Sequence, residues 1–263
     1  MAVQAELHTA RRARRYLLDR EGFLAPVLLL PSIVYIGALV AVPFLLAIAF
    51  ALSDVTVGDP SYDFVGLRNI AAVLDDPTFR RSLLNTVAFT AISMALVVVL
   101  GKILALILIA DFKGKWLVRL LVLLPWTTPA ALATVAWLWL LDSLFSPIDW
   151  VLRALGLLHG NAVYLGRPGL AVASVIAVQT WRITPLAAVI MMAGLVAIPD
   201  EITDAAAVDG AGFWRRLLEI TIPLNLPVIA VATLFGAILT FTDMTVVYVL
   251  TRGGPIDATQ VLA

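Results

Sequence analysis

Three ionisable side chains lie inside long apolar runs of this chain: Lys102, Arg182 and Asp243. An ionisable group within a bilayer costs about 2.5–3.5 kcal/mol on insertion scales, so each of them needs a structural or functional reason. Lys102 is eight residues, or about 12 Å, from the nearer end of its run. Its aliphatic stem can carry the ammonium group to the interface, and we therefore expect a structural role for Lys102.

Arg182 and Asp243 carry opposite charges at different expected depths. At 1.5 Å per residue, Arg182 lies about 20 Å from the end of its helix, and Asp243 lies about 10 Å from the corresponding end of the next one. A bridging water or the reach of the guanidinium group could bring them together as the lining of one polar cavity. A structural salt bridge is the alternative, and the sequence leaves both interpretations open.

A polar segment, residues 199–221, separates two apolar runs of membrane length. Pro199 is suited to start a helix, and Gly210 supplies a left-handed residue that ends it after about three turns. Asp200 and Glu201 place carboxylates at the positive end of the helix dipole. The segment is predicted to begin with a short helix that docks on a partner at one membrane face.

The middle of that short helix has the residue types of a contact surface. Ala205 and Ala206 leave one side smooth enough for close approach, while Asp204 and Asp209 offer acceptors to a basic or amide-lined cleft. After Gly210 a second, amphipathic helix is expected before the next span begins at Ile222-Pro223. Its apolar side is formed by Phe213, Trp214, Leu217 and Leu218.

The elements that must position these residues are membrane-spanning helices. Hydrophobic residues make up 62% of the chain, charged residues 14%, and the mean hydropathy is +1.00, which excludes a soluble globule. A spanning helix needs about 20 mostly apolar residues. Five segments meet that requirement: 23–52, 83–110, 116–141, 169–198 and 222–250. The predicted fold class is an all-α, multi-span membrane protein.

Two of the connecting segments have recognisable character. The loop at residues 53–81 is predicted to hold a short surface helix before Pro77. The loop at residues 142–168 mixes prolines and glycines with Trp150, Leu152 and Leu155. A segment of this kind is expected at the membrane interface rather than free in solvent.

The distribution of Lys and Arg predicts the orientation. A basic N-terminal arm, residues 1–22, and the loops at 111–119 and 199–221 together carry ten Lys and Arg, against six on the opposite side. By the positive-inside rule, the arm and the 199–221 loop are cytoplasmic. The first apolar run is longer than the roughly 7–15 residues of a signal peptide, so it is expected to remain as a helix.

Several function classes are excluded or disfavoured. The chain has no cysteine and only two histidines, His8 and His159, so no metal site and no cluster of catalytic residues is predicted. It has no Gly-x-x-x-x-Gly-Lys-[Ser/Thr] loop, so it is not expected to bind ATP. No cofactor bound by this chain and no nucleic-acid partner is predicted.

The spacing of Asp204-Ala205-Ala206, Gly210 and Ile220-x-Ile222-Pro223 resembles the cytoplasmic "EAA" loop of permease subunits of ATP-binding-cassette (ABC) importers, with Asp204 in place of the leading Glu. Over roughly residues 24–263, further motifs resemble the MalF-like branch of these permeases, which imports sugars. They are Phe64-Val-Gly-Leu-Arg-Asn69, Asn85-Thr86, Leu123-Leu-Pro-Trp126, Trp181-x-x-x-Pro185, Gly194-Leu-x-x-Ile-Pro199 and Leu250-Thr-Arg-Gly-Gly-Pro255.

This resemblance implies the transmembrane domain of a type I ABC importer in the cytoplasmic membrane, with a sixth span expected beyond Ala263. It implies three kinds of partner: a second permease subunit, an extracytoplasmic solute-binding protein and a cytoplasmic ATPase dimer that holds ATP and Mg. The residues implied to couple the permease to that ATPase are Asp204, Ala205, Ala206, Asp209, Gly210, Ile220 and Pro223.

The resemblance also implies a solute site between two helices. The residues that match are Gln179, Arg182, Ile183 and Leu186 on one helix and Ile238, Phe241, Thr242 and Asp243 on the other. A sugar or sugar-like solute is implied. Arg182 would also fit a phosphorylated or acidic solute such as a glycerophosphodiester. An ion-coupled secondary transporter is a further alternative, but it leaves the spacing around Gly210 unexplained.

Overall fold

The computed structural model describes residues 21–56, 58 and 62–263. Of the predicted basic arm at residues 1–22, residues 1–20 lie outside this part of the chain. The chain divides into two compact units, residues 1–75 and 76–263. The helices and helical turns make up the regular secondary structure of the described residues, and an isolated antiparallel bridge joins Ser53 and Phe64.

The first unit contains one long apolar helix and one short helix. The long helix is built from α2 (Glu21–Ile36), the π-helical turn η2 (Gly37–Ala41) and α3 (Val42–Ala51). No residue of its apolar stretch, Leu24–Ala51, is buried. The short surface helix predicted before Pro77 is confirmed as α4 (Arg68–Asp75). The Asn69 amide donates to the carbonyls of Ala51 and Ser53, which ties α4 to the end of α3.

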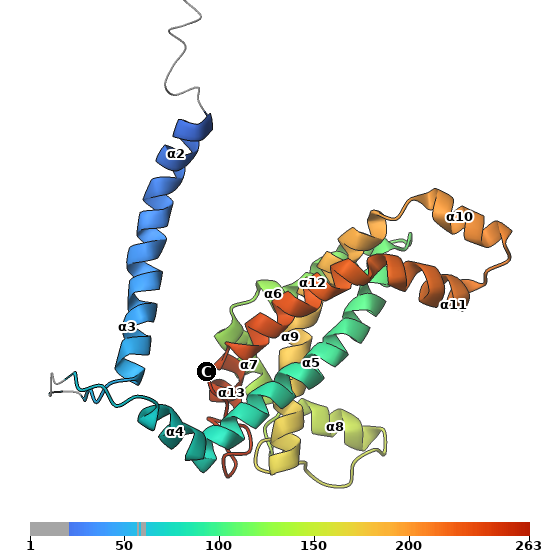
Figure 1. The fold of residues 1–263 in the computed structure, drawn as a ribbon. Coiled ribbons are helices and arrows are strands. Elements are labelled where there is room, and N and C mark those ends of the chain that lie inside the picture. Colours follow the sequence, from blue (N-terminus) through green and yellow to red (C-terminus); the bar gives the residue numbers. More distant parts are fainter. Residues whose placement is uncertain (1–20, 57, 59–61) are drawn as a thin grey trace, which may run out of the picture. The chain divides into compact units, whose positions relative to one another are not determined.

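The second unit is centred on three long helices. Helices α5 (Pro77–Ile109), α9 (Pro168–Val196) and α12 (Ile222–Phe241) pack side by side around a shared apolar core (Figure 1). The buried core residues are Met94, Val97, Ala105, Ile183, Ala187, Met191, Leu195, Ile229 and Ala232. Glycine permits a close approach of α12 to α5, since a Cβ on Gly236 would lie 2.8 Å from the Met94 sulfur.

Helix α5 begins earlier than the predicted span at residues 83–110. Pro77 occupies its first turn, and the Asp76 carboxylate accepts the Thr78 N–H at 2.7 Å as an N-cap. These local signals start the helix in a polar segment that a hydropathy window does not include.

The predicted single span at residues 116–141 is a bent pair of helices. Helices α6 (Lys115–Thr127) and α7 (Ala130–Leu140) meet at an angle of 99°. Pro129 lacks an N–H and disfavours helical geometry at the preceding residue, and Thr128 is extended, with ψ of 137°. The Thr128 hydroxyl donates to the Leu124 carbonyl at 2.7 Å, which satisfies one acceptor at the end of α6.

The predicted span at residues 222–250 differs from the structure at both ends. Helix α11 (Phe213–Arg216), the π-helical turn η3 (Leu217–Thr221) and α12 form one continuous helix, so the expected separate helix after Gly210 is the start of the span. A wider turn accommodates Pro223, which has no N–H for a normal helical bond. Helix α12 ends at Phe241, and α13 (Thr245–Leu250) follows.

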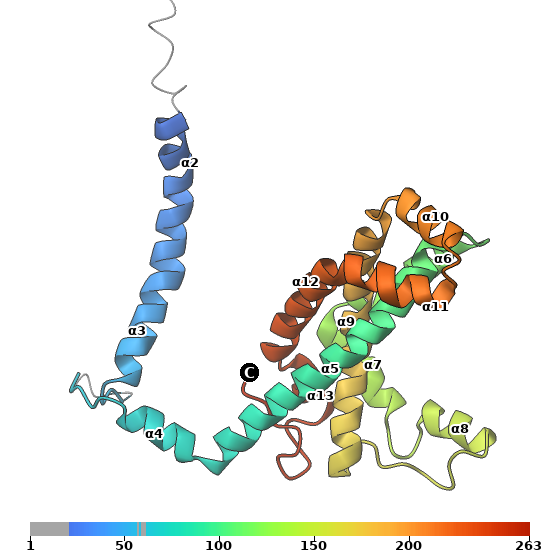
Figure 2. The same cartoon turned by 45° about the vertical axis from the view of Figure 1, so that its right-hand side comes forward.

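Two short helices lie at opposite ends of α9. Helix α8 (Pro147–Ala154) precedes the first residue of α9, and α10 (Asp200–Val208) follows its last (Figures 1 and 2). Four helices of the described chain are long and apolar enough to cross a membrane, and the α6–α7 pair makes a fifth if it is one broken span. The number of crossings remains a prediction.

Candidate functional site

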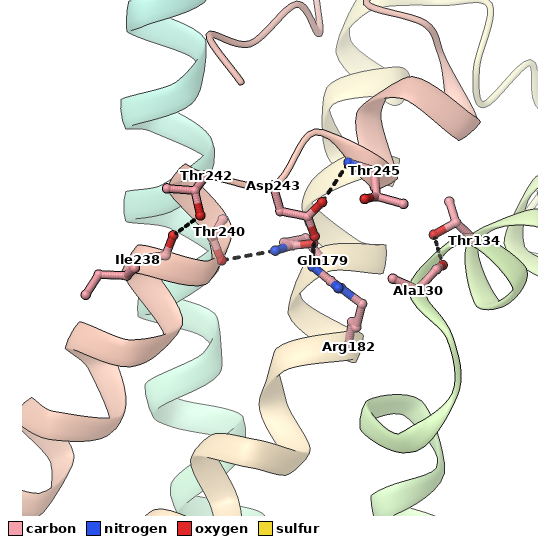
Figure 3. Close-up of polar contacts among 9 residues, drawn as sticks. All are labelled: Ala130, Thr134, Gln179, Arg182, Ile238, Thr240, Thr242, Asp243 and Thr245. Atoms are coloured by element: carbon pink, nitrogen blue, oxygen red, sulfur yellow. Dashed lines mark hydrogen bonds and ion pairs between the residues drawn. The ribbon is translucent and has the colours of Figure 1, made fainter. Parts of the chain in front are cut away.

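Arg182 and Asp243 form a direct ion pair inside the second unit (Figure 3). Arg182 comes from the middle of α9, and Asp243 comes from the turn between α12 and α13. Their side chains are only 13% and 19% exposed. Because α12 ends at Phe241 instead of continuing to residue 250, the turn brings Asp243 to Arg182, and the expected difference in depth disappears.

Neighbouring polar groups hold both members of this pair. The Arg182 guanidinium also donates to Gln179 Oε1 at 3.3 Å, and Gln179 Nε2 donates to Thr240 Oγ1 at 3.1 Å. The second carboxylate oxygen of Asp243 accepts the Thr245 N–H at 2.7 Å. One positive and one negative charge are therefore fixed in a network without net charge, here called the ion-pair cluster: Gln179, Arg182, Thr240 and Asp243.

A small cavity borders the ion-pair cluster. Its volume is about 20 Å³, and Gln179, Thr240 and Asp243 line it together with Ser93 and Phe241. The Ser93 hydroxyl is buried and has no hydrogen-bond partner in the described part of the chain. Such a volume holds about one water molecule, far less than the several hundred Å³ of ligand pockets. The cavity beside the ion-pair cluster is therefore too small to hold a sugar in this conformation.

The other residues predicted to contact a solute fall into two environments. Ile183 is completely buried in the core of the three long helices, and Leu186 is half-buried on the same helix. Ile238, Phe241 and Thr242 lie exposed at the end of α12. The structure thus joins three of the predicted residues in one network and leaves three as a surface beside it.

Sequence reasoning missed two contributors to this region. Thr240 was not singled out, although it lies one helical turn from Asp243. Asn85 was noted only as part of a motif, but its amide donates to the carbonyls of Ala258 and Gln260 at 3.2 and 2.9 Å. Together with Thr86, whose hydroxyl accepts the Leu262 N–H, it holds the segment after α13 against α5.

The left-handed stop predicted at Gly210 is confirmed. Gly210 has φ of +75°, its N–H donates to the Ala207 carbonyl, and the Ala211 N–H donates to the Ala206 carbonyl at 2.9 Å. These are the two hydrogen bonds of a Schellman motif, which closes the end of α10. Within α10, Asp204 and Ala205 are exposed and Ala206 is buried, while Asp209 caps the last turn and is exposed.

The α10 loop, residues 197–221, is short and firmly attached. Only residues 197–199 separate α9 from α10, and no break separates α11 from α12. Ile220 is half-buried and Pro223 is exposed. The large apolar side chains of Val208, Phe213, Trp214 and Leu218 are exposed. The loop therefore presents an apolar and acidic surface. It is connected to α9 by three residues and to α12 by a continuous helix, and these two helices carry the ion-pair cluster.

Lys102 and an apolar groove are two further features of the second unit. Lys102 is 7% exposed, and its ammonium group has no hydrogen-bond partner among the described residues. A groove of about 660 Å³ lies between α5, α6 and α9, with Trp181 and Pro185 in its wall. Its lining has no charged group, which suits lipid or another helix better than a hydroxyl-rich solute.

Within residues 21–56, 58 and 62–263, no group of three or more His, Cys, Asp or Glu side chains is placed to hold a metal ion.

Comparison with known families gives one match that covers most of the second unit. Residues 97–263 match the family described as "Binding-protein-dependent transport system inner membrane component".

Individual relatives match nearly the whole chain. The trehalose/maltose transport system permease protein MalF of Thermococcus litoralis is 33% identical over 91% of this chain and 81% of its own length. The sulfoquinovosyl glycerol transport system permease protein SmoG of Agrobacterium fabrum is 33% identical over 96% of this chain and 82% of its own length. The trehalose transport system permease protein SugA of Mycobacterium tuberculosis is 32% identical over 96% and 80%.

A solved structure shares the fold. A bacterial ABC transporter involved in the import of the acidic polysaccharide alginate superposes with a TM-score of 0.77 at 19% identity, over 93% of this chain and 82% of the matched chain. The complex of a bacterial alginate ABC transporter with an alginate pentasaccharide-bound periplasmic protein gives a TM-score of 0.75, also at 19% identity, over 92% and 80%.

Proposed function

Because this chain belongs to the family of inner membrane components of binding-protein-dependent transport systems, we propose that it is a permease subunit of an ABC importer for a sugar or a sugar-like solute. It is a multi-pass protein of the inner membrane, and its relatives are transport subunits rather than enzymes. The family description calls these transport systems binding-protein-dependent, and we infer that a solute-binding protein delivers solute to this permease.

The observation that carries the proposal is the attachment of the α10 loop. A partner ATPase that grips the exposed surface around Asp204 and Ala205 would move the ends of α9 and α12 together. Those helices hold Arg182 and Thr240, so closure of an ATPase dimer would reach the ion-pair cluster without an intervening flexible linker. ATP and Mg would be bound by that ATPase.

A second permease subunit would complete the solute site. The cavity beside the ion-pair cluster is too small for a sugar, whereas Ile238, Phe241 and Thr242 lie exposed next to it. A second subunit facing that surface would enclose a larger space between the two chains. In that space Phe241 would offer a ring to the apolar face of a sugar, and Thr242 would offer a hydroxyl. Alternating access would then open this space to either side of the membrane in turn.

The ion pair bears on the class of solute. Arg182 is neutralised by Asp243 and is held by Gln179, so a neutral, hydroxyl-rich solute meets a site without net charge. A phosphorylated or acidic solute such as a glycerophosphodiester would need Asp243 to release Arg182. We therefore favour a neutral sugar and keep the anionic solute as the second candidate.

Purification of the complex in mild detergent tests the assembly. We expect an ATPase and a second permease to accompany this chain. Gly210→Val should lower the recovered ATPase, because a β-branched residue disfavours a φ of +75°. Gly212→Ala is the matched control, because Gly212 has φ of −68° and open space around its Cβ position.

Recovery of the chain alone, with solute uptake driven by an ion gradient in proteoliposomes, would identify a secondary transporter. Equal recovery of the ATPase with Gly210→Val and with Gly212→Ala would remove the α10 loop from the coupling role. Uptake of a labelled glycerophosphodiester for which a neutral sugar does not compete would show that the solute is anionic.

A further inference from the structure

Helix α8 turns its apolar face outward. Trp150, Val151 and Leu155 are 68%, 47% and 66% exposed, and they follow one another on one side of the helix. The turn that leads into α8 and the turn that follows it expose Phe145 and Leu157 in addition. A large apolar surface on so short an element is unfavourable in water and indicates a missing contact.

The acidic side chain of α8 is turned inward and is hydrogen-bonded within its own loop. Asp149 is 1% exposed, and its Oδ2 accepts the Ala162 N–H at 2.7 Å. The Ser146 hydroxyl caps the helix by accepting the Asp149 N–H at 3.1 Å, and Arg153 is hydrogen-bonded to Asn161. An amphipathic helix in water exposes its charges and buries its apolar residues, whereas α8 buries its carboxylate and leaves Trp150 and Val151 exposed.

Tyr164 adds to this inward anchoring. Its hydroxyl is buried, as is the second carboxylate oxygen of Asp149. Burial of the phenol, followed by the hydrogen-bonding and charge effects of Asp149, raises the pKa of Tyr164 to about 12. The residues around Asp149 therefore fix the orientation of α8, and these contacts set the direction of its apolar face.

The connections of α8 keep it close to the ends of the membrane helices. Six residues, 141–146, separate it from α7, and the Asp142 carboxylate folds that link by accepting the N–H groups of Leu144 and Phe145. Residues 155–167 then lead to the first turn of α9. The helix lies at the end of the second unit opposite α10 (Figure 2).

We propose that α8 lies in the plane of the membrane interface, with Trp150, Val151 and Leu155 embedded among lipid acyl chains. The helices that flank α8 in the sequence also expose apolar side chains, Trp139 on α7 and Leu170 on α9. Tryptophan is enriched at that depth, where its ring bridges apolar and polar layers.

The charged side chains around α8 also fit contact with lipid. Arg153 and Arg167 are exposed and lie on either side of the loop that follows α8. Guanidinium groups bind phosphate well, so both suit lipid headgroups. The one acidic side chain of α8, Asp149, is withdrawn from the surface. A docked solute-binding protein is the alternative occupant, and the experiment separates the two.

Because the chain has no cysteine, single cysteines can be introduced for spin labelling without further changes. We would label Trp150→Cys and Val151→Cys in the complete complex, reconstituted in vesicles of phosphatidylethanolamine and phosphatidylglycerol. Collisions of each label with oxygen, which enters lipid, are compared with collisions with a charged nickel chelate, which stays in water. Leu28→Cys on the first apolar helix is the lipid reference, and the exposed Asp111→Cys is the aqueous reference.

The expected result is that both α8 labels favour oxygen over the chelate several-fold, as the Leu28→Cys label does. Asp149→Asn in the same background should reduce this preference, because it weakens the anchor that orients the helix. Chelate access equal to that of Asp111→Cys would overturn the proposal. Shielding from both reagents would overturn it too, and restored chelate access after removal of the solute-binding protein would assign the face to that protein. Solute uptake by each single-cysteine variant verifies that the complex is folded.

Discussion

The ion-pair cluster and the α10 loop use similar residue types in opposite surroundings. In the cluster, Arg182 and Asp243 are mostly buried, and every polar partner comes from another helix or from one turn away. In the loop, Arg215 and Glu219 also form an ion pair, at 2.9 Å, but both side chains are more than 60% exposed. The first pair joins two distant parts of the chain, whereas the second joins two neighbouring turns of one helix.

This difference separates residues that hold the bundle together from residues that serve a partner. A partly buried pair in a membrane protein lacks water as an alternative partner, so its members depend on each other. Exposed residues of the loop are solvated in the isolated chain and are free to exchange water for a partner protein. Changes in the cluster should therefore affect stability, and changes in the loop should affect assembly.

Asp243→Asn should have the largest effect. It leaves the Arg182 charge without a counter-ion, at a cost of about 3 kcal/mol, and it should lower both the unfolding temperature of the purified complex and the uptake of solute. The double variant Arg182→Met with Asp243→Leu should recover most of the stability without restoring uptake. Equal instability of the single and double variants would show that the ion pair is not the source of the loss.

Gly194→Ala should have the next largest effect, and it tests whether helix packing matters as much as charge. A Cβ at Gly194 would lie 2.5 Å from Asn225 Oδ1, so α9 and α12 would have to separate, at about 1–3 kcal/mol. Gly169→Ala in the first turn of the same helix is the control, because its Cβ position is open. The unfolding temperature of Gly194→Ala should be lower than that of Gly169→Ala. Equal unfolding temperatures would contradict the close approach of α9 and α12 at Gly194.

Asp204→Ala should change assembly more than stability. Asp204 is exposed in the middle of α10, so the free energy of unfolding of the chain should change by less than about 0.5 kcal/mol. The amount of ATPase that copurifies should fall several-fold. Glu201→Ala, one turn earlier and also exposed, should leave that amount unchanged. A loss of stability with Asp204→Ala, without loss of ATPase, would reverse the roles assigned to the two regions.

Glu219→Gln should have the smallest effect, and it is the direct counterpart of Asp243→Asn. The same replacement of a carboxylate by an amide removes the exposed Arg215–Glu219 pair, whose charges are screened by water and salt. Neither the unfolding temperature nor the uptake of solute should change measurably. A drop comparable to that of Asp243→Asn would mean that burial does not distinguish the two pairs.

Features with local causes were predictable. The end of α10 depends on Gly210 and on hydrogen bonds to residues a few positions back, and the helix before Pro77 depends on a short amphipathic pattern. The break between α6 and α7 also has a local cause in Pro129. It was nevertheless missed, because a hydropathy window measures apolar content and gives no weight to a missing N–H.

Features with distant causes were not predictable. Asn85 was visible as part of a motif, but its three carbonyl partners lie more than 170 residues away. Thr240 gave no signal beyond its position, because its partner Gln179 lies on another helix. The predicted difference in depth between Arg182 and Asp243 rested on a straight helix to residue 250, which the structure replaces by a turn.

The sequence by itself determined that this protein is a helical membrane protein of the permease family, because apolar content and the Gly210 spacing are properties of short stretches of chain. Only the tertiary structure decided that Arg182 meets Asp243 directly, that Ile183 lies in the core while Phe241 lies at the surface, and that α8 turns its apolar face outward. Each of these depends on where one helix ends relative to another. That relation is set by packing between residues far apart in the chain, and no local pattern encodes it.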